Sequence, residues 1–395
     1  MIREEYDIVI IGAGASGLML AAQLDLKGAP GIILEGSSVP GSKLLMSGGG
    51  HCNITHGGSI KDFLYAYGDA GQALRRCLYR HSNLELAKWL DARGVDLADE
   101  NGDPLDMSEG PKALDGAGRI FPASMKSRDV LDAFTAEASR NGWPIRTGAK
   151  VSGLESTDGW KISLTDGEVI KARSVVIASG GITYPETGSD GSVLKMLKAL
   201  GISIKEPRPA LAPIYVEEYP YADLAGISLP DVTVTVFGSD ASCTCKGKAA
   251  AMKGDMLFTH EGFSGPAVLN VSGYAEAGEK IRFSYNKELS GLPKRMQRVL
   301  TDRARGDSGD VRTTVLASLL DHDDFIIKSI DRRGMVTAGG VALTDMDMRT
   351  MSVRGFEGLY VIGEALEAYG ITGGYNLQLC WSTAAAAADD LIKAG

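Results

Sequence analysis

The sequence lacks an excess of positive charge, and it contains few cysteines. Lys and Arg number 41 against 50 Asp and Glu, which gives a formal net charge of −9 at pH 7. Because a negatively charged chain is repelled by a phosphate backbone, we expect no nucleic-acid partner. The five cysteines are scattered and odd in number, a pattern typical of reduced thiols rather than of a disulfide framework.

A long uninterrupted hydrophobic run is also absent. The first apolar stretch, residues 8–22, contains three glycines and follows no basic leader, which favours a strand and a helix over a signal peptide or a membrane span. The sequence has no internal repeat and no low-complexity linker. We therefore expect a cytoplasmic protein without a membrane partner, and its 395 residues are enough for two or three domains.

The most informative segment that is present is GAGASG, at residues 12–17. An apolar run at 7–11 precedes it, a helix-like run to residue 26 follows, and a short second strand at 31–34 ends on Glu35. This order is typical of a βαβ unit that binds a dinucleotide, with the pyrophosphate at the helix N-terminus and a ribose on the acid. The loop residues assigned to this contact are Gly12, Gly14, Ala15, Ser16 and Gly17.

Three later segments indicate that the dinucleotide is FAD. Residues 39–56, VPGSKLLMSGGGHCNITH, contain a second glycine-rich stretch that would bring bare backbone against a large ligand. Residues 148–181 alternate as three strands with two turns, and they are similar to the β-meander of glutathione-reductase-type FAD domains. The strand within 358–366 carries a Gly363-Glu364 pair that resembles the Gly-Asp pair holding the ribityl chain of FAD. The further residues assigned to FAD are Gly41, Ser42, Lys43, Gly49, Gly50, Cys52, Asn53, Val151, Ala178, Ser179, Gly180, Gly363, Glu364, Gly374, Tyr375, Asn376 and Leu377.

The segment ITGGYNLQL, at 371–379, is expected to meet the flavin ring. Its two glycines precede a helix, so the N–H groups from Gly374 to Leu377 would face the pyrimidine edge and stabilise negative charge on reduced flavin. In the competing interpretation the glycines only bend the chain before a packed helix, and Asn376 and Gln378 are ordinary helix caps.

Several longer blocks carry a family resemblance. They are SGGGHCNITH, GRIFPASMKSRDVLDAF, ASGGITYPETGSDG, FTHEGFSGPAVLNVS, AGGVALTDMDMRTMSVRGFEGLYVIGEAL and ITGGYNLQLCWST. With these blocks the sequence resembles the YhiN/BaiN-like flavoproteins, also labelled the aminoacetone oxidase family, over nearly the whole chain. The resemblance implies bound FAD and an α/β fold, in which a glutathione-reductase-type Rossmann FAD domain contains an inserted antiparallel β-barrel and a small helical part. The chain departs from the family pattern at His51, His56 and Cys380.

The FAD domain is expected to be discontinuous. It takes residues 1–192 and 336–395, and the inserted barrel and helical part take 193–335. Apolar spacing predicts helices within 61–97, and the alternation VTVTVFG at 232–238 predicts a strand of the barrel. The segment 286–334 is charged and has the periodicity of helices.

Candidates for proton transfer are Tyr184, Tyr375 and His260, since each could give a proton to a substrate carbon opposite the hydride. In the competing interpretation all three are structural groups with satisfied hydrogen bonds. Cys243 and Cys245 could form half of a metal site or a redox pair, but no matching pair of ligands occurs in the sequence. We therefore expect no metal.

The function of such a chain stays open among three candidates. No second GxGxxG follows a strand within 192–335, so NAD(P)H would bind only transiently at the flavin. The favoured candidate is an NAD(P)H-driven reductase of conjugated C=C bonds in a small apolar substrate, such as an enone or a steroid, because the insertion is large enough to shape an apolar pocket. The others are an amine oxidase of the aminoacetone-oxidase type, which produces hydrogen peroxide, and a non-catalytic flavin redox sensor.

Overall fold

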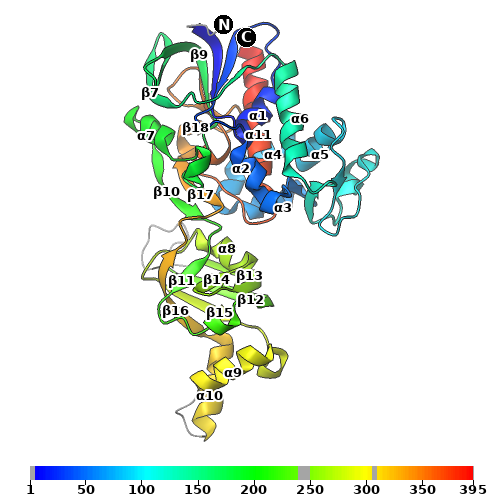
Figure 1. Ribbon diagram of the computed structural model, residues 1–395, viewed down its shortest axis with the longest axis vertical. Helices are drawn as coiled ribbons and strands as arrows, with labels where there is room; N and C mark the ends of the chain where they lie inside the picture. The colour runs from blue at the N-terminus through cyan, green and yellow to red at the C-terminus, as the bar shows by residue number, and fades with distance from the viewer. Residues whose placement is uncertain (1–4, 239–249, 305–308, 395) are drawn as a thin grey trace. The chain divides into compact units, whose positions relative to one another are not determined.

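The computed structural model describes residues 5–238, 250–304 and 309–394. The chain forms two compact units (Figure 1): the larger contains the residues up to Arg208 and those from Val336 onward, and the smaller is Pro209–Met335. The larger unit is thus discontinuous in sequence. The insertion expected from residue 193 begins later, because α7 (Ser192–Ala199) packs against β7 (Val151–Thr157) inside the larger unit.

A nine-stranded sheet forms the centre of the larger unit, with the order β18-β19-β20-β9-β1-β2-β6; β8 also pairs with β9, and β7 pairs with β8. The strands from β20 to β6 are parallel and strongly apolar, as expected for strands covered on both faces. The sheet therefore has the Rossmann arrangement predicted from residues 7–35. The strands are β1 Glu5–Ile11, β2 Gly31–Leu34, β6 Ile145–Arg146, β7 Val151–Thr157, β8 Gly159–Leu164, β9 Val169–Ile177, β18 Met346–Asp347, β19 Ser352–Val353 and β20 Leu359–Val361.

The three strands predicted within 148–181 are confirmed as the antiparallel meander β7-β8-β9. Its last strand returns to the parallel sheet, where Val175 and Ile177 lie beside β1 and β20. This return brings Ala178 against the first glycine of the GAGASG loop.

Helices α1 (Ala15–Gln23), α6 (Ser127–Arg140) and α11 (Tyr375–Ala394) lie beside one another along the sheet (Figure 1). The alanines at 384–388 are buried in this layer, because small side chains let α11 approach α1 closely. The helices predicted within 61–97 are confirmed as three separate segments. The remaining elements of the larger unit are α2 Ser42–Met46, α3 Ile60–Ala66, α4 Gly71–Arg80, α5 Asn83–Asp91, β3 Thr55–His56, β4 Leu97–Ala98 and β5 Arg119–Pro122.

The smaller unit is a closed antiparallel barrel with the strand order β11-β14-β13-β12-β15-β16. Its core contains an aromatic cluster of Phe258, Phe263, Phe283 and Phe325. Strand β12 contains all of the predicted VTVTVFG segment except its final glycine, and the alternation of its buried valines confirms the prediction. The elements are β11 Ile214–Val216, β12 Ser228–Phe237, β13 Ala250–Phe258, β14 Gly262–Ser264, β15 Lys280–Ser284, β16 Asp323–Ile330, α8 Pro266–Ser272, α9 Lys294–Arg303 and α10 Gly309–Asp321.

The segment 286–334 is only partly helical. Helices α9 and α10 form as predicted, but residues 323–330 are β16, which closes the barrel by pairing with β15 and β11. This strand is not evident from the sequence, because the buried Asp323 is charged and the exposed Ile326 is apolar, so the residue types do not alternate as the burial does. Two strands, β10 (Ile204–Ala210) and β17 (Val336–Val341), pair with each other where the chain leaves and re-enters the larger unit.

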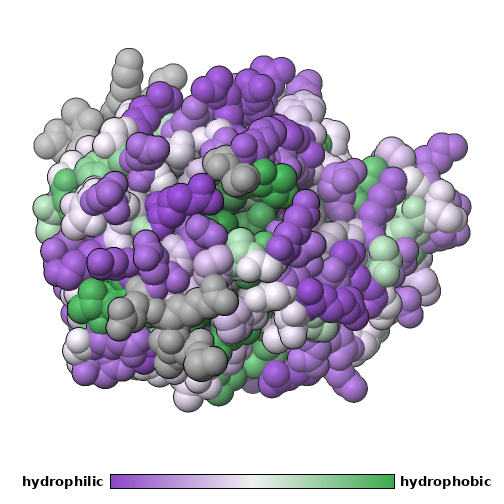
Figure 2. Space-filling view, turned by 90° about the horizontal axis from the view of Figure 1, so that it is seen from above, coloured by the Kyte–Doolittle hydropathy of each residue, from purple (hydrophilic) through white to green (hydrophobic). Residues whose placement is uncertain are grey.

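The face seen in Figure 2 is mostly hydrophilic, with hydrophobic side chains in small separate patches. The large hydrophobic side chains exposed within the described residues, such as Tyr65, Tyr79 and Ile392, are scattered along the sequence. Among the same residues, no helix has both the length and the apolar character needed to span a bilayer.

Candidate functional site

The loop after β1 contains two kinds of glycine. A Cβ on Gly17 would lie 2.0 Å from the carbonyl oxygen of Gly12, and one on Gly12 would lie 2.5 Å from that of Ala178. These two glycines are therefore required by the chain's own packing. Gly14 is different: it has an ordinary φ of −79°, and no atom lies within 4 Å of the position of its Cβ. The chain itself does not explain a glycine there, whereas a ligand against the backbone would.

Glu35 stands at the end of β2 beside this loop, as predicted. Its carboxylate accepts hydrogen bonds from the N–H groups of Ala13 and Ser37, each at 2.7 Å. The N–H of Ala149 donates to the backbone oxygen of Glu35, which places the start of β7, with Val151, close to the acid. These contacts fix the position of a carboxylate at the loop that would receive the pyrophosphate.

The second glycine stretch turns back on itself after α2. Gly48, Gly49 and Gly50 all have positive φ, from 57° to 94°, a conformation that favours glycine. No atom lies within 4 Å of the Cβ position of Gly49 or Gly50. Other glycines on the surface also have no neighbour at Cβ, but within these two loops the positions without one are Gly14, Gly49 and Gly50, which are called the open glycines below.

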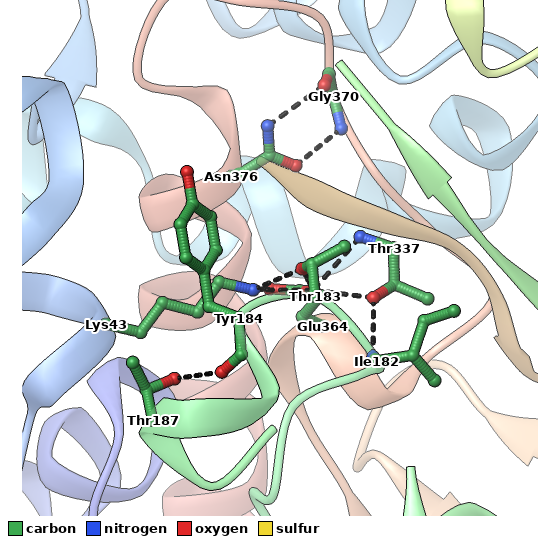
Figure 3. A network of polar contacts seen from close by, with 9 residues as sticks. All are labelled: Lys43, Ile182, Thr183, Tyr184, Thr187, Thr337, Glu364, Gly370 and Asn376. Carbon is green, nitrogen blue, oxygen red and sulfur yellow. Dashed lines mark hydrogen bonds and ion pairs between the residues drawn. The ribbon is translucent and has the colours of Figure 1, made fainter. Parts of the chain in front are cut away.

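A network of polar side chains joins Lys43 of α2 to Glu364, which follows β20 (Figure 3). The ammonium of Lys43 donates to both carboxylate oxygens of Glu364, at 2.7 and 2.9 Å, and to the hydroxyl of Thr183 at 2.7 Å. Thr337 of β17 donates to the same carboxylate through its N–H (3.0 Å) and its hydroxyl (2.8 Å). Glu364 is thus held by four donor groups, counting that of Thr183.

The sequence identified Lys43 and Glu364 but missed Thr183 and Thr337. The four residues of the network come from four segments that are far apart in the sequence. No local sequence pattern indicates that the two threonines belong to it. Gly363, beside Glu364, has a φ of 65°, and a Cβ there would lie 2.7 Å from Ser16 of α1. The predicted Gly363-Glu364 pair therefore lies directly against the GAGASG loop.

The N-terminus of α11 is tied to the second glycine segment. With its amide oriented to satisfy both hydrogen bonds, Asn53 accepts from the N–H of Gly374 and donates to the oxygen of Thr55, each at 3.0 Å. Asn376 binds Gly370 through two hydrogen bonds, of 2.8 and 2.9 Å (Figure 3). Both amides hold the turn before the helix. Asn376 lies inside α11 and its side chain bonds Gly370 outside the helix, which differs from the helix cap of the competing interpretation, where the side chain accepts from an N–H of the first turn.

Tyr375 is largely buried among aromatic rings. Its ring stacks on His56 with centroids 5.2 Å apart and meets Phe63 edge to face at 4.9 Å. Burial raises the pKa of its hydroxyl, so the group stays protonated at neutral pH. The departure from the family pattern at His56 thus places an imidazole against a predicted catalytic tyrosine.

Tyr184 adopts a left-handed conformation, with a φ of 57°, which is unusual for a residue with a large side chain. Its half-buried ring lies 5.8 Å from the ammonium of Lys43. In Figure 3 its hydroxyl points away from the network around Glu364. The hydroxyl is therefore not used by that network.

The other predicted residues are distributed as follows. Ala178, Ser179 and Gly180 lie beside the GAGASG loop, and Gly41 and Ser42 begin α2. His260 is exposed in the turn between β13 and β14 of the smaller unit, and Cys243 and Cys245 lie outside the described residues. Burial raises the pKa of the Cys52 and Cys380 thiols to about 12, so both stay neutral. No group of three or more potential metal ligands occurs among the described residues.

The residues present fit FAD. The open glycines leave backbone accessible in the two loops where a pyrophosphate and a flavin would pass, and hydrogen bonds fix Glu35 and Glu364, the two acids that would bind the ribose and the ribityl chain. These residues would therefore account for binding of the adenosine half, the phosphates and the ribityl chain of FAD.

Comparison with known proteins gives one family. The family model described as HI0933-like protein Rossmann domain matches residues 6–390. Ribosomal RNA dihydrouridine synthase of Escherichia coli is 28% identical to this chain over 429 residues, which cover 99% of each protein. The 3-dehydro-bile acid delta(4,6)-reductase of Clostridium scindens is 26% identical over 419 residues, which cover 95% of this chain and 96% of the reductase.

Among solved structures, a 3-ketosteroid delta1-dehydrogenase from Sterolibacterium denitrificans aligns over all of both chains, with a TM-score of 0.52 and 12% identity. At this identity the alignment supports the fold alone. It agrees with the predicted Rossmann FAD domain and its inserted second unit.

Proposed function

We propose that this chain, which belongs to the HI0933-like Rossmann domain family of FAD-dependent oxidoreductases, reduces a C=C bond conjugated with a carbonyl group and receives hydride from NAD(P)H. The observation that carries the proposal is that the names of two relatives, each matched over nearly its full length, describe the same type of reaction. Forming dihydrouridine saturates a C=C bond conjugated with a carbonyl of the uracil ring. A delta(4,6)-reductase acting on a 3-dehydro-steroid likewise saturates C=C bonds conjugated with a ketone.

The cofactor residues have separate tasks in this proposal. When bound, FAD supplies hydride transfer between the nicotinamide and the substrate carbon. The open glycines admit its phosphates and ring, and Glu35 accepts hydrogen bonds from the adenosine ribose. Lys43 holds Glu364 in place near the ribityl chain. The N–H of Gly374 donates to Asn53, so the N–H groups of Tyr375, Asn376 and Leu377 would stabilise negative charge at the pyrimidine edge.

A proton must reach the carbon next to the carbonyl after hydride transfer. Tyr184 is the first candidate, because its hydroxyl is outside the Glu364 network and its ring lies beside Lys43. Tyr375 is the second candidate. Burial raises the pKa of its hydroxyl, which keeps the proton available, but only 8% of the residue is exposed to a substrate. His260, on the smaller unit, is the third. If Tyr184 is the acid, Tyr184→Phe lowers the rate of substrate reduction by about 10²–10⁴-fold while NAD(P)H still reduces the flavin.

For the substrate we propose a small apolar enone. A uracil base within RNA is the second candidate, and the name of the Escherichia coli relative favours it. The formal net charge of −9 disfavours binding of a phosphate backbone. For this reason we rank the small enone above RNA as the substrate.

The deciding experiment reduces the purified holoenzyme anaerobically with NADH, NADPH or a small amine, and follows the flavin band near roughly 450 nm. The reduced enzyme is then mixed with dioxygen together with a steroid enone or a uridine-containing RNA. Rapid reduction by NAD(P)H and reoxidation by the enone is the expected result. Fast reduction by an amine, with stoichiometric hydrogen peroxide and no product from the enone, would contradict the proposal in favour of an oxidase. No reoxidation by any acceptor would favour the redox sensor.

A further inference from the structure

A second candidate site lies in the larger unit, in a cavity of about 180 Å³ between α4, α11 and the turn joining β18 to β19. Helices α4 and α11 pack against each other along this region (Figure 1). The side chains that line the cavity include four that are permanently cationic. The lining residues are Arg76, Cys77, Arg80, His81, Arg349, Thr350, Ala386 and Lys393.

Two of the four cations have acidic partners. Arg80 pairs with Asp389 at 2.6 Å, and Arg349 pairs with Asp347 at 2.6 Å. Among the described residues, neither Arg76 nor Lys393 forms an ion pair. Within the part of the chain that the structure describes, two positive charges in the cavity wall therefore have no acidic partner.

The spacing of the arginines on α4 adds to this surplus. Arg76 and Arg80 stand four residues apart on one face of the helix, and like charges at this spacing destabilise a helix slightly. Helix C-termini attract cations, which accounts for Arg80 and Lys393 at the ends of α4 and α11. It does not account for Arg76, which precedes the last turn of α4. A bound anion would turn this repulsion into attraction.

The floor of the cavity is held rigidly. The backbone oxygen of His81 accepts hydrogen bonds from Ser382 (2.6 Å) and Gln378 (3.2 Å) of α11. The imidazole of His81 lies 3.3 Å from Asp389, and burial lowers its pKa, with Asp389 acting in the opposite direction. Burial also raises the pKa of the Cys77 thiol to about 12. This thiol, which lines the cavity, therefore stays neutral. The end of α4 that carries Arg80 is thus fixed on α11.

We propose that this cavity binds a phosphate group, either free inorganic phosphate or the phosphomonoester of a nucleotide. A phosphate ester carries a charge of about −1.5 to −2 at neutral pH, which matches the two unpaired cations. The planar guanidinium of Arg76 presents two donors that suit a phosphate edge, and Lys393 adds a point charge. Nothing in the cofactor site described above uses these residues.

The test titrates inorganic phosphate into the oxidised holoenzyme by calorimetry, at constant ionic strength with chloride as the balancing anion. Saturable binding is expected for the natural chain. Arg76→Ala and Lys393→Gln should each weaken it by about ten- to a hundredfold, the effect of losing one charge-assisted hydrogen bond. Arg75→Ala is the matched control: Arg75 is the neighbouring exposed arginine on α4, it faces Tyr79 and does not line the cavity. It should bind phosphate as the natural chain does.

A second arm separates the two sources of phosphate. Adenosine 2′-monophosphate that binds at least about tenfold more tightly than inorganic phosphate, and loses that affinity in Arg76→Ala, identifies a nucleotide ligand. Equal affinity for both identifies free phosphate. The proposal is overturned if phosphate shows no saturable binding, or if Arg76→Ala and Lys393→Gln bind it as well as Arg75→Ala does. Flavin absorbance in every variant confirms that the larger unit is folded, and no turnover is needed, so the result does not depend on the proposed reaction.

Discussion

The two units of the chain use their polar side chains in opposite ways. In the barrel, Asp323 is fully buried among aromatic rings, accepts hydrogen bonds from Tyr221 and Tyr285, and pairs with Arg303 at 2.7 Å. In the larger unit, the side chains of Lys43 and Glu364 keep 25% and 18% of their exposure. Glu364 follows Gly363, whose Cβ position lies 2.7 Å from Ser16 of the GAGASG loop. In the barrel, every polar group of the buried network finds its hydrogen-bond partner within the chain, and such a network specifies packing. In the larger unit, the network is partly exposed, so its groups remain available to a ligand.

The polar groups of the two units therefore have different roles. Burial raises the pKa of Asp323, opposed mainly by Arg303, and raises those of Tyr221 and Tyr285. Structural networks of charged and polar groups produce such shifts as well as active sites do, and here Tyr221, Tyr285 and Arg303 satisfy the carboxylate of Asp323. The barrel's polar cluster is therefore interpreted as the anchor of α9, which ends at Arg303.

The largest expected effect is on the barrel. Asp323→Ala removes the carboxylate that pairs with Arg303 and accepts from two tyrosine hydroxyls. It leaves the cation without a counter-charge and should lower the free energy of unfolding by about 3–5 kcal/mol. Chemical denaturation followed by circular dichroism measures the change. The double variant Asp323→Leu with Arg303→Met is the control, and it should be less destabilised because no unpaired charge stays buried. If Asp323→Ala also releases FAD while the barrel remains folded, the assignment of this cluster to packing is wrong.

The glycines of the GAGASG loop provide a sharper contrast. Gly17→Ala places a Cβ 2.0 Å from a backbone oxygen and should destabilise even the apoprotein, by about 3 kcal/mol. Gly14→Ala meets no atom of the chain, so the stability of the apoprotein should be unchanged. FAD affinity should nevertheless fall by at least about tenfold, because the methyl group occupies the ligand's place. Thermal unfolding of the apoproteins and FAD titration separate the two effects, and full FAD binding by Gly14→Ala would contradict the proposed site.

The next effect concerns Glu35. Glu35→Ala should weaken FAD binding by roughly 1.5–3 kcal/mol, the contribution of hydrogen bonds to a charged group. Catalysis should recover in excess FAD. Equilibrium dialysis of FAD measures the change, with Glu168→Ala, at the turn before β9, as a control that should leave affinity unaltered. An unchanged dissociation constant for Glu35→Ala would show that its two hydrogen bonds to the backbone are its whole role.

Local patterns were enough to predict part of this arrangement. The βαβ unit, Glu35 and the meander follow one another in the sequence, so the order of strand, glycine loop and acid predicts their positions. The network around Glu364 could not be predicted, because Thr183 and Thr337 meet it only after the sheet has assembled. Strand β16 was missed for a related reason: a buried aspartate is typical of neither strand nor core, and only Arg303 and the two tyrosines make its burial favourable.

The smallest expected effect tests a half-exposed ion pair of the larger unit. Asp190 pairs with Lys150 at 2.7 Å and accepts a hydrogen bond from the N–H of Ser192. Partial burial acts to raise the pKa of Asp190, but the hydrogen bonds from Lys150 and Ser192 together lower it to about 2, from 3.8. Because the unfolded chain binds the proton more readily, this pair stabilises the fold fully above about pH 4, and the contribution is lost as the pH falls towards 2.

Asp190→Asn should therefore reduce stability at pH 7 by less than about 1 kcal/mol, the range of exposed pairs, and the two chains should converge in acid. Denaturant unfolding between pH 2 and 7 measures the difference. A loss that equals that of Asp323→Ala, or one that does not depend on pH, would show that the larger unit relies on its polar pairs as the barrel does.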